Sequence, residues 1–180
     1  MREPLPMRWF GFAAELAPPP PSCAWRSPSP PLCGREDLLT AGYSGTPLAR
    51  KLNLKDGMRV WWDHMPDKVR DEIAREALAL DTLPAPEPGL DAAHIFVTRY
   101  ADIEAKLALL RPLLDPAGFV WVSWPKRASK VDTDITEDRI RDAILPATAA
   151  LAEQNWVDVK VCAVDDVWSG LKLVIRKAAR

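Results

Sequence analysis

The segment Phe119–Trp124 constrains the fold most strongly, because its flanks complete a helix–turn–strand unit. Apolar residues at helical spacing over Ile103–Leu114 predict a helix, and Pro116-Ala117-Gly118 predicts a tight turn. The apolar strand that follows stops at Pro125, which cannot donate to a sheet ladder. A helix followed by a turn and a strand is the second half of a βαβ crossover, so the segment predicts an α/β fold.

Apolar runs at residues 58–63, 93–98, 157–164 and 171–176 predict the remaining strands. We therefore expect a single, mostly parallel Rossmann-like sheet of about five strands with a C-terminal antiparallel hairpin. The expected spatial order is 58–63, 93–98, 119–124, 171–176, 157–164. If the first three strands follow one another in one direction, right-handed connections place the crossover helices on the same face.

The N-terminal region differs in composition from the rest of the chain. Nine of the 18 prolines fall in residues 1–31, and no helical or strand period is sustained over residues 1–37. This predicts a disordered, proline-rich tail before an α/β domain at residues 38–180. Two alternatives stay open: the tail is a ligand for a proline-binding module, or translation begins downstream of Met1.

Charge and cysteine content exclude several classes of protein. With 24 basic and 25 acidic residues and no basic stripe, the chain does not match a nucleic-acid-binding protein. No apolar run reaches the roughly 20 residues of a membrane span, and the start lacks a secretory signal. We therefore expect a cytoplasmic protein. Three cysteines and two histidines without clustering argue against a metal site, and Cys162 is interpreted as a buried thiol rather than a nucleophile.

Alternation within the strands predicts one aliphatic sheet face and one face that mixes aromatic and charged residues. The mixed face is a candidate interaction surface, for a protein partner or a homodimer, and carries Trp61, His94, Phe96 and Trp121. The alternative is that loops and a short helix near residues 47–52 cover this face.

Ligands of open α/β sheets bind outside the carboxyl ends of the parallel strands. That edge supplies the candidate ligand-binding residues Asp63, His64, Arg99, Trp124, Lys126 and Asp134. Cationic groups and an indole ring suit a small anion or a phosphorylated ligand. The alternative is that Trp124 closes the core and Lys126 is solvated.

No catalytic constellation stands out. Asp63 and His64 are an acid and a base, but neighbours on a strand point to opposite faces. Ser123 and Ser169 lack a local base, so no activated nucleophile is assigned. We expect a non-catalytic binding or interaction module. The alternative is a small enzyme that acts on an anionic metabolite through Asp63, His64, Arg99 and Lys126.

The run Leu109-Leu-Arg-Pro-Leu-Leu-Asp-Pro-Ala-Gly118, its following strand and the final hairpin resemble the late part of Rossmann-like methyltransferases. The resemblance implies a sheet over about residues 58–176 and, in the family, S-adenosylmethionine bound at a glycine-rich turn after the first strand. The corresponding segment, Trp62-Asp-His-Met-Pro-Asp67, contains no glycine. Side chains there obstruct a close backbone approach, so no cofactor is expected.

Four strings resemble a bacterial family known as "domain of unknown function 3052". They are Ala41-Gly-Tyr-Ser-Gly-Thr-Pro-Leu48, Val122-Ser-Trp-Pro-Lys126, Val157-Asp-Val-Lys-Val-Cys-Ala-Val-Asp165 and Trp168-Ser-Gly-Leu-Lys-Leu-Val174. The resemblance spans about residues 40–177 and agrees with a domain that starts after the proline-rich region. It implies no activity.

Overall fold

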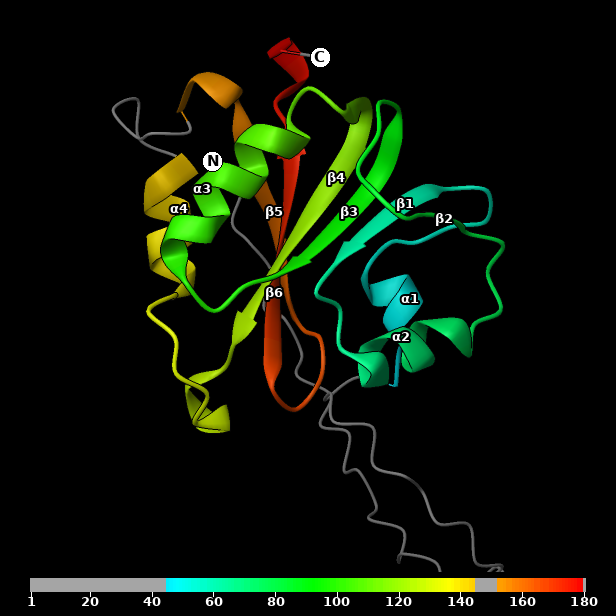
Figure 1. Cartoon of the computed structure of the whole chain (residues 1–180), viewed down its shortest axis with the longest axis horizontal. Helices are drawn as coiled ribbons and strands as arrows, with labels where there is room; N and C mark the ends of the chain where they lie inside the picture. The colour runs from blue at the N-terminus through cyan, green and yellow to red at the C-terminus, as the bar shows by residue number, and fades with distance from the viewer. Residues whose placement is uncertain (1–44, 145–151, 180) are drawn as a thin grey trace, which may run out of the picture. The chain divides into compact units, whose positions relative to one another are not determined.

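The computed structural model describes residues 45–144 and 152–179, so the predicted tail at residues 1–37 lies outside the described residues. The described part is an α/β unit (Figure 1). Its helices and strands, in chain order, are α1 (Leu48–Lys51), β1 (Arg59–Asp63), α2 (Asp67–Ala74), β2 (Asp81–Leu83), β3 (Leu90–Phe96), α3 (Tyr100–Leu110), β4 (Leu114–Pro125), α4 (Glu137–Ile144), β5 (Trp156–Ala163) and β6 (Trp168–Ile175). Short 3-10 turns occupy Arg127–Ser129, Ala152–Gln154 and Lys177–Ala179.

The sheet has six strands in the order β2-β1-β3-β4-β6-β5. Strands β2, β1, β3 and β4 are parallel, and β6 and β5 form the antiparallel hairpin. The predicted order of five strands is confirmed, and the predicted strand count is corrected by β2 at the edge. β2 has only three residues, too few to produce a recognisable alternation.

Strand β2 also changes where the helices lie. The connection from β1 through α2 runs outward to β2, whereas the connection from β3 through α3 runs to β4, in the opposite direction across the sheet. Right-handed crossovers in opposite directions place their helices on opposite faces. The expectation that both helices share one face is therefore wrong: α1 and α2 lie on one side of the sheet, and α3 and α4 on the other (Figure 1).

Helices consequently cover both faces of the central strands, which corrects the predicted interaction surface. His94, Phe96 and Trp121 are 0%, 4% and 1% exposed beneath α1 and α2. The Trp121 indole N–H donates to the Leu52 carbonyl at 2.9 Å, at the end of α1. Trp61 lies on the opposite face, where it packs half-buried against the α3 side of the core. The structure instead has the alternative arrangement, in which a short helix covers this face.

The predicted turn at Pro116–Gly118 is a bulge inside β4, where the register with β3 shifts. A Cβ on Gly118 would lie 2.9 Å from the carbonyl oxygens of Leu90 and Asp91, so only glycine fits. This close approach lets β4 continue along β3 to Pro125.

Candidate functional site

The six candidate ligand-binding residues all follow the carboxyl ends of β1, β3 and β4, as expected, but they form three separate groups. Asp63 and His64 belong to the first group, Arg99 and Asp134 to the second, and Trp124 and Lys126 to the third.

The first group is an ion-paired carboxylate at the end of β1. Asp63, whose side chain is 12% exposed, binds the Lys106 ammonium of α3 and lies 2.6 Å from His64 Nδ1. Sequence reasoning placed Asp63 and His64 on opposite faces. The structure brings them together because His64 has left the strand and takes a left-handed conformation at φ 55°. The carboxylate is thus already matched by a protein cation.

The second group fixes the loop that leads to α4. Arg99 binds Asp132 at 2.7 Å on the exposed surface. Asp134 accepts the backbone N–H of Tyr100 at 2.8 Å, and its carboxylate lies 3.5 Å from Arg139. These contacts tie the loop to the start of α3. Asp134 is therefore a structural residue. Thr136 Oγ1 caps α4 by accepting the Arg139 N–H at 3.2 Å.

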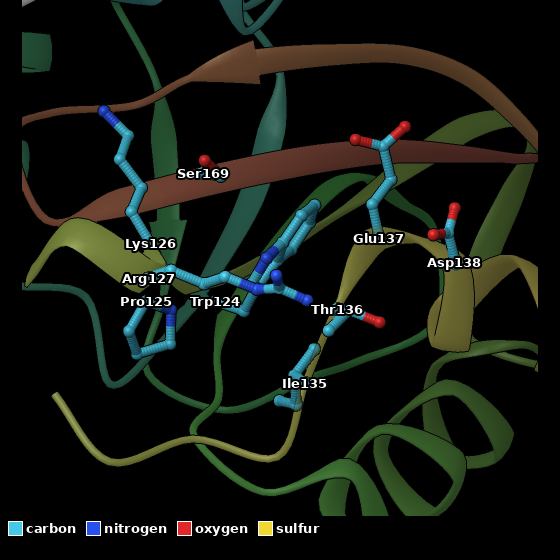
Figure 2. A pocket seen from close by; sticks show the side chains of 9 residues that line it. All are labelled: Trp124, Pro125, Lys126, Arg127, Ile135, Thr136, Glu137, Asp138 and Ser169. Carbon is cyan, nitrogen blue, oxygen red and sulfur yellow. The ribbon is translucent and has the colours of Figure 1, made fainter. Parts of the chain in front are cut away.

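The third group lies at a pocket of about 320 Å³ between the end of β4, the start of β6 and the first turn of α4. We call it the β4 pocket, and it is lined by Trp124, Pro125, Lys126, Arg127, Ile135, Thr136, Glu137, Asp138 and Ser169 (Figure 2). Its apolar wall is Trp124, Pro125 and Ile135, all three buried. Its volume falls at the lower end of the roughly 300–1,000 Å³ of small-molecule sites.

Trp124 is only 6% exposed, yet its indole N–H has no hydrogen-bond partner among residues 45–144 and 152–179. The N–H groups of two other buried tryptophans are satisfied: Trp121 donates to Leu52, and Trp156 donates to Gln154 Oε1 at 2.9 Å. The Trp124 N–H is not among the fully buried side-chain atoms that lack a partner in the described residues, so it keeps access to the pocket that Trp124 lines. Trp124 therefore offers the β4 pocket a donor that the described protein leaves unused.

The cation available to the pocket is Arg127 rather than Lys126. The Lys126 ammonium donates to the Asp165 carbonyl at 2.5 Å, and Figure 2 shows it pointing away from the other lining side chains. The Arg127 side chain extends into the pocket in the same view. No carboxylate of the described residues forms an ion pair with it, and it is exposed.

Five polar lining residues were not predicted from the sequence: Arg127, Thr136, Glu137, Asp138 and Ser169. Arg127 directly follows the predicted candidate Lys126, so its position just after a strand end could have marked it as a candidate too. The others come from a helix start and a hairpin, and nothing in their local sequence indicates that β4 and β6 bring them to one place.

A second polar pair lies inside the core. His94 Nε2 lies 2.7 Å from Ser123 Oγ, and both residues are 0% exposed. His94 Nδ1 has no partner in the described part of the chain. Burial lowers the pKa of His94 from 6.5 to about 3, so the imidazole is neutral at pH 7. The ring stacks on Phe96 with centroids 4.3 Å apart, and without access to solvent the pair serves packing.

Metal-ligating side chains do not gather in threes in the described ranges, and no described helix is long and apolar enough to cross a membrane. Cys162 is a half-buried free thiol whose pKa is raised by burial, which fits the predicted unreactive role.

The turn after β1 does not fit S-adenosylmethionine, the cofactor implied by the methyltransferase resemblance. Met65 is 6% exposed and packs into the core under α2, so its side chain fills the turn. The Asp63 carboxylate is engaged by Lys106 and contacts His64. The chain therefore offers no glycine cradle for this cofactor at the turn after β1.

Comparisons with known proteins return solved methyltransferase structures at low similarity. A SAM-dependent methyltransferase from Aquifex aeolicus is 13% identical, with 72% of this chain and 88% of that chain covered and a TM-score of 0.47. Fibrillarin from Aeropyrum pernix is 12% identical, with 72% and 69% covered and a TM-score of 0.41. No family model and no curated protein sequence matches. The likeness concerns the Rossmann-like α/β sheet and carries no argument about activity.

Proposed function

We propose that this chain is a non-catalytic module that binds a small molecule carrying an anionic group in the β4 pocket. The observation that supports this most directly is the Trp124 indole N–H, which lies at the pocket wall and has no acceptor among the described residues. A ligand oxygen would satisfy this donor, and the apolar wall would bury the rest of the ligand.

Arg127 is the reason for proposing an anionic group on the ligand. A guanidinium presents several N–H donors in a planar fork that matches carboxylate and phosphate oxygens. Because Arg127 has no ion-pair partner in the described ranges, a ligand anion would not have to displace a protein carboxylate. The proposed anion site is thus at the end of β4, with Arg127 in the role that the sequence analysis gave to Lys126.

The alternative of a small enzyme receives less support. It required Asp63, His64, Arg99 and Lys126 to converge, and only Lys126 lines the pocket. Asp63 and Arg99 are each bound to an oppositely charged protein side chain elsewhere on the surface. Since a general acid or base must reach the reacting group, dispersed residues favour binding over catalysis.

The indole N–H signals of the whole chain, labelled with nitrogen-15, provide a direct test. A screen of small carboxylates and phosphates should contain members that shift the Trp124 Nε1–H resonance, assigned through Trp124→Phe. The Trp121 and Trp156 signals are internal references, because their N–H groups are already bonded within the protein. Arg127→Gln should weaken each hit by about tenfold, as expected for a lost charge-assisted contact.

Arg75→Gln is the matched control, because Arg75 is exposed and lies outside the pocket. The binding proposal is wrong if no compound moves the Trp124 signal, or if all three indole signals move together.

A further inference from the structure

The β4 pocket holds two opposite charges that face the same space without meeting. Arg127 enters from the segment after β4, and Asp138 from the first turn of α4 (Figure 2). Neither side chain forms an ion pair within the described part of the chain, and they do not pair with each other within 4.0 Å. From this arrangement, and resting on the proposed function, we infer that the ligand is a zwitterion of amino-acid size.

The neighbouring carboxylate does not compete with Asp138 for the role. Glu137 also lines the pocket, but Arg141 binds it at 2.5 Å, one helical turn further along α4. Its charge is therefore matched within the protein. Asp138 interacts with Arg141 only at longer range and without an ion pair, so it is the lining carboxylate that a ligand ammonium can contact directly.

The charges required of the ligand follow from this pair. A ligand with an anion alone would bind Arg127 but would bring its negative charge toward Asp138 and Glu137. A ligand with an amine alone would leave Arg127 unmatched. A molecule with both groups matches both charges of the pocket, and its anionic oxygen would be an acceptor for the Trp124 N–H.

The part of the ligand between the charges is apolar or aromatic. Trp124, Pro125 and Ile135 supply the apolar part of the lining, and an indole ring favours contact with another ring. The volume of about 320 Å³ accommodates an amino acid but not a dinucleotide. The inferred class is an α-amino acid, or a comparable zwitterion, with a large apolar side chain.

Three compounds with the same phenyl group separate the charge requirements: L-phenylalanine, 3-phenylpropionate and 2-phenylethylamine. Each is titrated into the full chain at pH 7 while the Trp124 Nε1–H signal is followed. We expect L-phenylalanine to bind at least about tenfold more tightly than either singly charged compound.

Two substitutions test which pocket residue binds each charged group of the ligand. Arg127→Gln should remove the advantage of L-phenylalanine over 2-phenylethylamine, and Asp138→Asn should remove its advantage over 3-phenylpropionate. Asp142→Asn, on the exposed side of the same helix and outside the pocket, is the control and should change neither ratio. A merely structural effect of either substitution would weaken all three compounds equally.

Three results overturn the inference. If 3-phenylpropionate binds as tightly as L-phenylalanine, the zwitterion inference is wrong while the anion-binding proposal stands. If none of the three compounds shifts the Trp124 signal although another screened anion does, the same conclusion holds. If no screened compound shifts that signal, the proposed function fails together with the inference.

Discussion

Lowering the pH from 7 to 5 should destabilise this protein through His94. Burial lowers the pKa of His94 from 6.5 to about 3, and the unfolded chain binds a proton near pH 6.5. Below pH 6.5 the unfolded state therefore holds more protons than the folded state, so the free energy of unfolding falls as the pH falls. The stability is complete above pH 6.5 and is lost progressively toward pH 3.

The magnitude follows from the linkage relation. Between pH 7 and pH 5 the unfolded imidazole gains almost a full proton while the folded one stays neutral, which removes about 2 kcal/mol of the free energy of unfolding. This window lies above the range in which most carboxyl groups titrate. The chain has only two histidines, so His64 is the position for the control substitution.

Urea unfolding followed by circular dichroism at pH 5, 6 and 7 measures this loss. The His64→Gln variant should keep the pH dependence. The double variant His94→Phe with Ser123→Ala removes both members of the buried pair and should abolish most of it. Any overpacking by phenylalanine would lower stability at every pH and leave the slope unaffected. A wild-type midpoint that stays constant from pH 7 to 5, or an equal loss in the double variant, would refute the reasoning.

Three further predictions concern the core and the thiol. Trp121→Phe should reduce the free energy of unfolding by about 1–3 kcal/mol, because the Leu52 carbonyl loses its buried donor; equal urea midpoints would contradict this. Gly118→Ala should destabilise by about 1–3 kcal/mol, since its Cβ would meet two carbonyl oxygens, and the same titration decides it. Cys162 should be alkylated at pH 8 about tenfold more slowly in the folded than in the urea-unfolded chain, measured by peptide mass spectrometry; equal rates would show an accessible thiolate.

The β4 pocket lies at the strand end where the sequence predicted ligand binding, and two of its nine lining residues, Trp124 and Lys126, were among the predicted candidates. Trp124 could be placed because a strand that ends at proline has a definite carboxyl end, and ligands of open sheets bind there. Lys126 was the nearest cation in sequence, yet its ammonium bonds to Asp165, and Arg127 takes the place beside the pocket. The direction of a side chain after a strand end depends on its contacts with the neighbouring hairpin. The local sequence pattern contains no information about those contacts.

The sequence by itself determined the class of fold and the order of five strands, because alternation, breakers and right-handed connections act locally or as general rules. Only the tertiary structure decided that helices cover both faces of the sheet. The three-residue β2 carries no readable period, yet it turns the first crossover outward and places α2 over His94 and Trp121. The tertiary structure also brings Arg127 and Asp138 to one pocket, because the segment after β4 and the start of α4 meet only when the sheet and its helices are packed.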